Sequence, residues 1–87
     1  MKYRVKSICK TCDACPAQWS GRTVDGKTIY IRYRWGGFRI EIDGHIVSAV
    51  YTEEPFAGAM SNEEMIEMTT ETLDFSEAQW VESTEAL

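Results

Sequence analysis

The fold is decided by residues 17–51, which read AQWSGRTVDGKTIYIRYRWGGFRIEIDGHIVSAVY. Three turn signals, Asp25-Gly26, Gly36-Gly37 and Asp43-Gly44, separate runs in which apolar and polar residues alternate. Such dipeptides between alternating runs are the strongest local signal for β-hairpins. The stretch predicts strands near residues 17–23, 27–35, 38–42 and 45–51, and we expect a further strand at residues 2–8.

The length of each loop sets which residues lie opposite one another. A two-residue loop at Gly36-Gly37 pairs Trp35 with Phe38 and Tyr33 with Ile40, which makes this face the core. The next hairpin adds four residues to the same face, namely His45, Val47, Ala49 and Tyr51. On the other face, this register places Arg34 opposite Arg39 and Glu41 opposite Arg32.

The first hairpin calls for a longer loop. A three-residue loop, Val24 to Gly26 with Gly26 in a left-handed bulge conformation, pairs Trp19 with Ile31. A two-residue loop would turn Arg22 toward the core instead. Because burying an aromatic ring is favourable and burying an unpaired charge is costly, we expect the bulged loop.

The second half of the chain has helical patterning. Ser61 and Glu64 form a capping box, and apolar residues follow at helical spacing as far as Leu73. Ser76 and Gln79 offer a second start, for a short helix. The predicted fold is α+β: an antiparallel β-meander of four to five strands with one or two C-terminal helices packed on one face. We expect a single domain of residues 1–87, with a basic β-sheet half (1–51) and an acidic helical half (52–87).

Charge is distributed very unevenly along the 87 residues. All nine Lys and Arg lie in the first 44 residues, beside four acids, whereas the remaining residues hold ten acids and no Lys or Arg. The two parts either neutralise each other in the fold or present a charged surface to a partner. The candidate acidic surface for a basic protein partner comprises Glu63, Glu67, Glu71, Asp74 and Glu77.

The basic surface is the sheet face away from the helices, where Tyr30, Arg32, Arg34 and Arg39 are expected. Like charges opposite each other destabilise a sheet, so an anion should lie nearby. It is either the chain's own acidic segment, in the same or a second copy, or the phosphate or carboxylate of a ligand. The second alternative corresponds to nucleic-acid or nucleotide binding.

Three cysteines form the pattern Cys9-x2-Cys12-x2-Cys15. A zinc site needs four ligands, and Asp13 and His45 are the candidates for the fourth. The pattern also resembles the start of an iron–sulfur motif that lacks its last cysteine. Because no second cysteine pair exists, we expect unligated thiols and no cofactor, with a zinc-stapled structural module as an alternative.

Several functional classes are disfavoured. No apolar run approaches the 18 residues of a membrane helix, and no secretory leader is recognisable, which predicts a cytoplasmic protein without membrane contact. No phosphate-binding glycine loop and no oriented Cys–His pair is present, so we expect no enzymatic activity.

The segment from Cys15 to Gly36, with the pattern CPxQWxGRTxDG…YIRYRWG, resembles small uncharacterised proteins of bacteriophages and bacteria. The resemblance implies a phage or mobile-element accessory protein. Together with the charge layout, it favours a small non-enzymatic binding module that binds and inhibits a host macromolecule, as an anti-defence protein or nucleic-acid mimic does. Both a monomer and a homodimer are compatible with the sequence.

Overall fold

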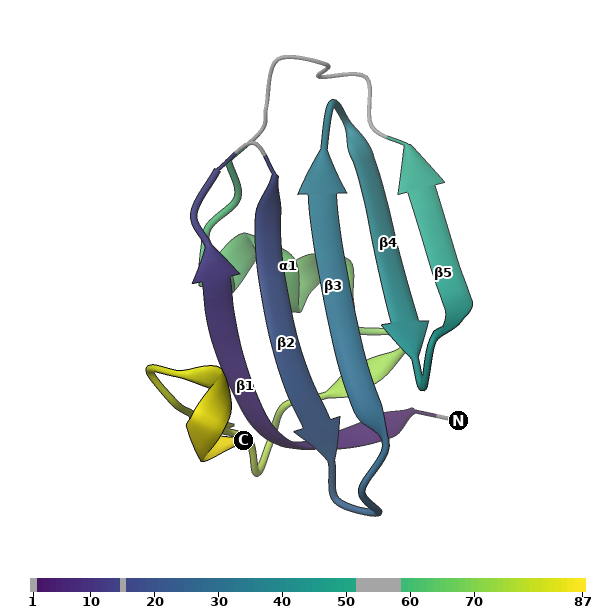
Figure 1. The fold of residues 1–87 in the computed structure, drawn as a ribbon. Coiled ribbons are helices and arrows are strands. Elements are labelled where there is room, and N and C mark those ends of the chain that lie inside the picture. Colours follow the sequence, from purple (N-terminus) through teal and green to yellow (C-terminus); the bar gives the residue numbers. More distant parts are fainter. Residues whose placement is uncertain (1, 15, 52–58) are drawn as a thin grey trace.

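The computed structural model describes residues 2–14, 16–51 and 59–87 (Figure 1). Its elements, in chain order, are β1 (Tyr3–Cys12), β2 (Ala17–Thr23), β3 (Thr28–Arg34), β4 (Gly37–Ile42), β5 (His45–Tyr51), α1 (Asn62–Met68), β6 (Leu73–Asp74), β7 (Gln79–Trp80) and the 3-10 helix η1 (Thr84–Ala86). No helix among these described residues is long and apolar enough to cross a membrane.

The strands form one mixed sheet, in the order β5-β4-β3-β2-β1-β6, with β7 also paired to β1. Strands β1 to β5 are antiparallel neighbours, whereas β6 and β7 run parallel to β1. Figure 1 shows that β1 curls as it passes from the bottom of the sheet to the side of β2. The expected antiparallel meander with C-terminal helices is therefore wrong, because the fold is mostly β and its C-terminal segment adds two short parallel strands.

The helical prediction is correct at its start and wrong at its end. The Ser61–Glu64 capping box is present, but α1 ends at Met68, where Thr69 caps it. The Thr69 hydroxyl donates to the Ile66 carbonyl at 3.1 Å. Threonine is β-branched and competes for backbone hydrogen bonds, so it has a low helix propensity. Leu73, expected on the helix, instead pairs with Tyr3 of β1.

The expected second helix after Ser76 is a strand. Gln79 and Trp80 pair with Ser7 and Ile8, and the Val81 N–H donates to the Ile8 carbonyl at 2.9 Å. A helix of six residues is only marginally stable by itself, whereas pairing here supplies partners for backbone groups of β1.

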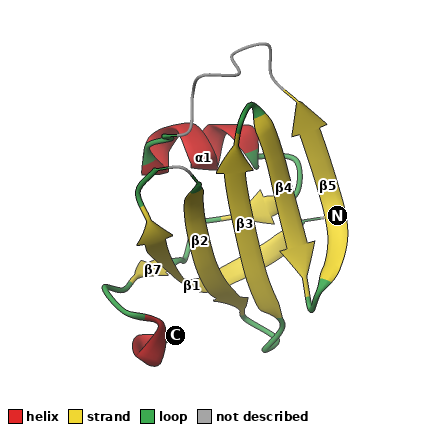
Figure 2. Cartoon of the chain, turned by 45° about the horizontal axis from the view of Figure 1, so that its top comes forward, coloured by secondary structure: helices red, strands yellow, loops and turns green. Residues whose placement is uncertain are grey.

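The core lies between the sheet and α1, which covers one face of it (Figure 2). Trp19, Ile31, Ile40 and Met65 are among its fully buried side chains. Trp35 and Val47, which were expected in the core, are 65% and 39% exposed.

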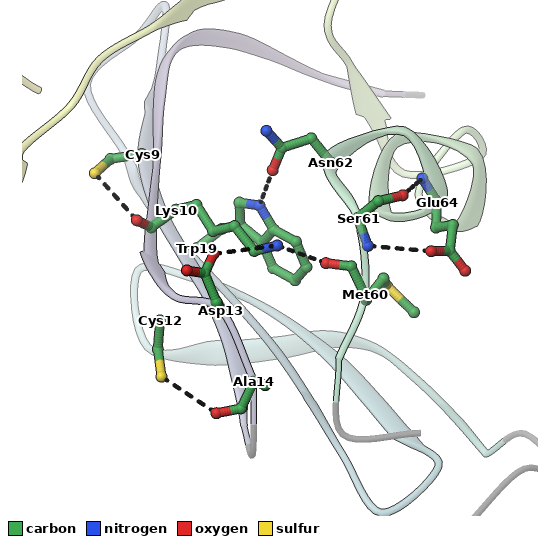
Figure 3. A network of polar contacts seen from close by, with 10 residues as sticks. All are labelled: Cys9, Lys10, Cys12, Asp13, Ala14, Trp19, Met60, Ser61, Asn62 and Glu64. Atoms are coloured by element: carbon green, nitrogen blue, oxygen red, sulfur yellow. Dashed lines mark hydrogen bonds and ion pairs between the residues drawn. The ribbon is translucent and has the colours of Figure 1, made fainter. Parts of the chain in front are cut away.

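Trp19 joins both layers (Figure 3). Its indole Nε1–H donates to Oδ1 of Asn62, the first residue of α1, at 2.9 Å. Lys10 Nζ lies 5.2 Å from the centre of the indole ring and donates to the Met60 carbonyl at 2.7 Å. Two hydrogen bonds thus fix α1 and the segment before it against β2 and β1, and the cation–π contact holds Lys10 of β1 against Trp19 of β2.

The β2–β3 register is confirmed. Trp19 lies opposite Ile31, and Gly26 has a φ of +88° in the three-residue loop. The Lys27 N–H donates to the Thr23 hydroxyl at 2.9 Å and closes this loop.

The β3–β4 register differs from the prediction. The two-residue loop is Trp35-Gly36, so Arg34 lies opposite Gly37 and Ile31 lies opposite Ile40. This register also pairs Ile29 with Ile42, burying an isoleucine where the predicted register would bury Trp35. It further allows Asp43 Oδ1 to accept from the Thr28 N–H at 2.8 Å.

The β4–β5 register changes along its length. Ile42 lies opposite His45 as predicted, but a bulge then places Ser48 opposite Ile40 and Val50 opposite Phe38. Because one extra residue reverses which side chains face the core, Ala49 and Tyr51 lie on the open face instead. The predicted core positions of Val47, Ala49 and Tyr51 are therefore wrong.

Replacing Asn62 with Ala should lower the free energy of unfolding by about 1–3 kcal/mol, since it leaves a buried indole N–H without its acceptor. The measurement is urea denaturation followed by circular dichroism. Glu63→Ala, at the next and exposed residue, is the control and should cost only a few tenths of a kcal/mol. Equal losses in the two variants would contradict the role assigned to this hydrogen bond.

Candidate anion-binding site

One face of the sheet is covered by α1 and the other is open. Buried and less buried residues alternate along β2, β3 and β4, so every second side chain points to the open face. This open face lies toward the viewer in Figure 1, with α1 behind the sheet. It carries the arginines of β2, β3 and β4: Arg22, Arg32, Arg34 and Arg39.

A shallow hollow of about 390 Å³ lies on this face, where the β3–β4 loop and the end of β5 meet. We call it the arginine hollow. Three of the four predicted anion-binding residues line it, and Tyr30 does not. Its lining comprises Arg32, Arg34, Trp35, Gly37, Phe38, Arg39, Ala49 and Tyr51.

The strand register brings the arginines together. Arg32 lies directly opposite Arg39, and Arg34 is two residues further along β3, opposite Gly37. The predicted opposition of Arg34 and Arg39 is therefore wrong, because the register is shifted by two residues, but Arg39 still lies opposite an arginine. Glu41 lies opposite Tyr30 rather than Arg32.

Two exposed aromatic side chains flank these arginines. Trp35 sits in the hairpin loop, with its ring centre 5.7 Å from the Arg34 guanidinium carbon. Tyr51 is 85% exposed, and its ring lies over Gly37, so that a Cβ at Gly37 would be 3.2 Å from Tyr51 Cε1. Sequence reasoning missed both residues as site residues because it assigned them to the core.

The backbone of Trp35 is strained. Its φ is +54°, in the left-handed region that Gly and Asn adopt most readily. A bulky residue in this conformation costs about 1–2 kcal/mol. Because the Trp35 side chain is also exposed, its own burial does not offset that cost. Backbone strain of this kind is concentrated at functional sites.

Positive charge dominates the arginine hollow. Glu41 Oε2 lies 2.9 Å from Arg39 Nε, an ion pair whose angle falls short of a hydrogen bond. Arg32 Nε is buried and has no hydrogen-bond partner among the described residues. No described acidic residue of the C-terminal half forms an ion pair with these arginines. Arg34 is exposed and forms no ion pair with a described residue, so its guanidinium donors remain available to an anion.

A second hollow, of about 340 Å³, has two of its three cations paired with acids of the described chain. It is lined by Lys2, Tyr3, Arg4, Val24, Asp25 and Lys27. Arg4 pairs with Glu77 at 2.7 Å and Lys27 with Asp25 at 3.8 Å. A hydrogen bond from the Thr23 hydroxyl holds the pKa of Asp25 below its usual range, so this carboxylate stays charged. The arginine hollow is the better anion site.

Comparisons with protein-family models, curated proteins and solved structures give no significant match.

The acidic residues do not share one helix face. Glu63 and Glu67 are exposed on α1, but Glu71 lies beyond its end. Asp74 belongs to β6, and hydrogen bonds from Ser76 hold its pKa below its usual range. Glu77 pairs with Arg4, which is the one described ion pair that joins the two oppositely charged halves.

The candidate metal ligands are only partly brought together. Cys9 is buried and Cys12 half-buried on β1, and their thiols contact the carbonyls of Lys10 and Ala14 (Figure 3). Cys15 lies outside the described residues. His45 is exposed on β5, four strand spacings from β1, or about 19 Å. No group of three potential ligands occurs within residues 2–14, 16–51 and 59–87.

Replacing Arg32 with Met should raise the free energy of unfolding by about 0.2–1 kcal/mol, because it removes a like charge directly opposite Arg39 and keeps the apolar stem. Arg34→Met is the matched control. Arg34 lies opposite Gly37, so this substitution should not raise the free energy of unfolding. Thermal denaturation at low and high salt measures both effects, and salt should stabilise the wild type more than Arg32→Met. Equal responses of the two variants would contradict repulsion between Arg32 and Arg39.

Proposed function

We propose that the protein is a non-enzymatic binding module whose arginine hollow binds a nucleotide unit, either within a single-stranded nucleic acid or as a free nucleotide. The observation that carries the proposal is the convergence of three guanidinium groups with two exposed aromatic rings at one end of an open sheet face. The two kinds of group match the two parts of a nucleotide.

The arginines suit the phosphate. A guanidinium group presents planar, paired N–H donors that match phosphate oxygens, and it keeps its charge at all physiological pH values. Arg32 and Arg39 lie side by side across neighbouring strands, so one phosphate can contact both. A bound anion would also relieve the repulsion between them, which gives the site a physical reason to favour its occupied state.

The aromatic rings suit the base. Stacking of a base on an aromatic side chain contributes about 1–3 kcal/mol and tolerates any base, because every base has a π-face. Trp35 and Tyr51 are exposed at the rim of the hollow, within reach of a ligand whose phosphate lies on the arginines. This arrangement favours an unpaired base over duplex DNA, whose bases are stacked on one another.

The net charge of −5 does not prevent such binding. The surplus of acids belongs to the part of the chain after residue 44, and α1 lies on the opposite face of the sheet from the hollow (Figure 2). At physiological salt the Debye length is about 8 Å, so distant charges are largely screened. Among the described residues, the three nearby arginines then dominate the local electric field.

The acidic-surface hypothesis is the weaker alternative. Glu63 and Glu67 are exposed and form no ion pair with another described residue, which supports a basic protein partner. The five predicted residues do not form a helical surface, since α1 ends before Glu71 and Asp74 belongs to β6. The phage and host-inhibition context implied by the resemblance stays a prediction.

The sharpest test is Trp35→Asn, which should separate stability from binding. Asn adopts the left-handed conformation more readily, so the free energy of unfolding should rise by about 1 kcal/mol. Loss of stacking should weaken the binding of a fluorescein-labelled oligo-dT or of AMP about tenfold or more. Thermal denaturation and fluorescence anisotropy, with competition by unlabelled AMP, measure the two effects.

Two further variants test the charges. Arg34→Gln should weaken binding and lower its salt dependence, whereas Arg22→Gln, on the same face but outside the hollow, should leave the affinity within about twofold. Trp35→Asn or Arg34→Gln protein that binds like the wild type would contradict the proposal. A loss of stability in Arg34→Gln with unchanged binding would instead identify an internal counter-charge.

A further inference from the structure

The outermost strand of the sheet, β5, is unusual for an exposed edge. Its sequence, HIVSAVY, contains no Lys, Arg, Asp, Glu or Pro. Ile46 and Val50 are 60% and 45% exposed, and Tyr51 is almost fully exposed. Proteins normally protect a sheet edge with charges, prolines or a covering element. The one irregularity in β5 is the bulge near its start.

The second edge of β5 has no partner among the described strands, since β5 pairs only with β4 in that set. Hydrogen-bonded pairs alternate along an antiparallel ladder, and the residues that flank a two-residue loop form one. Counting along β4 from the Ile42–His45 pair, Ser48 and Val50 direct their backbone groups toward β4. Ala49 and Tyr51 therefore direct theirs outward.

We propose that this edge pairs with β5 of a second copy of the chain, antiparallel about a two-fold axis at Ala49. In this register Ala49 faces its own counterpart, Val50 faces the partner's Ser48, and Tyr51 faces the partner's Val47. The pairing uses the strand from Val47, the extra residue of the bulge, to Tyr51 and keeps Ala49 opposite Ala49 on the open face.

A second copy is the occupant that this strand fits best. An uncharged strand rich in β-branched and aromatic residues provides no charge that would select a different partner. The two paired strands carry no Lys, Arg, Asp or Glu that could repel each other, and the small Ala49 side chains allow the two chains to approach at the axis. The same properties make such a segment prone to pair with its own kind.

The dimer would join two binding sites. Ala49 and Tyr51 line the arginine hollow, so each hollow would border the paired strands. The two Tyr51 residues would lie about 14 Å apart on one continuous face, because they are separated by four residues along the strand and by one spacing between strands. This consequence rests on the proposed function, whereas the dimer itself does not. It predicts that an oligonucleotide long enough to reach both hollows binds more tightly than a mononucleotide.

The test is the oligomeric state of the full chain without ligand, by sedimentation equilibrium from about 1 µM to 1 mM. The wild type should pass from monomer to dimer with rising concentration. Ala49→Lys places two like charges opposite each other at the axis and should remain a monomer at every concentration. His45→Lys adds the same charge to β5 outside the paired segment and should dimerise like the wild type.

Amide hydrogen exchange gives an independent readout of the register. Exchange at Ala49 and Tyr51 should slow with rising protein concentration in the wild type and not in Ala49→Lys. A wild type that is monomeric throughout the concentration range, or an Ala49→Lys variant that still dimerises, would overturn the proposal. Neither result depends on ligand binding, so the dimer can fail while the arginine hollow still binds its ligand.

Discussion

The burial of Trp19 is the interaction on which the rest of the structure depends. Its side chain is fully buried on β2, opposite Ile31 of β3, and its indole N–H is bonded to the first residue of α1. Lys10 of β1 lies over the ring and holds the carbonyl of Met60. One side chain therefore fixes β1, β2, β3 and the start of α1 relative to one another, and places the helix on a single face of the sheet.

That arrangement leaves the other face uncovered, and the register decides what is exposed there. Because Trp19 aligns with Ile31, the neighbouring Arg32 must point to the open face, and the β3–β4 pairing then places Arg39 beside it. The two-residue loop falls on Trp35 and Gly36 rather than on two glycines. The chain thus accepts a like-charge pair and a strained tryptophan at the same end of the sheet, and the proposed binding of an anion rests on these two features.

The sequence was most informative where a large energy difference separates two alternatives. Burying Trp19 is so much more favourable in free energy than burying Arg22 that the bulged β2–β3 loop could be predicted. A loop at Gly36-Gly37 and a loop at Trp35-Gly36 give two registers that both place apolar pairs on the core face. Hydrophobicity alone therefore did not decide the β3–β4 register. The outcome depends on gaining the Ile29–Ile42 pair and the hydrogen bond from Thr28 to Asp43.

Strands β6 and β7 have two residues each, too short for any periodicity to indicate them. The arginines of the site were predictable from the alternation of apolar and polar residues. Trp35 and Tyr51 were not, because the sequence assigns an aromatic residue in a strand to the core unless the register is known.

The central claim is that the arginine hollow binds a nucleotide unit, and the three tryptophans offer a direct measurement. Each indole N–H gives its own NMR signal: Trp19 is buried in the core, Trp35 is at the hollow, and Trp80 is in β7, which pairs with β1 on the far side of β2 and β3 from the hollow. Titration with AMP or a short oligo-dT should shift the Trp35 indole signal progressively to saturation and leave those of Trp19 and Trp80 in place. An unmoved Trp35 signal at millimolar ligand, or equal shifts of all three signals, would contradict the account.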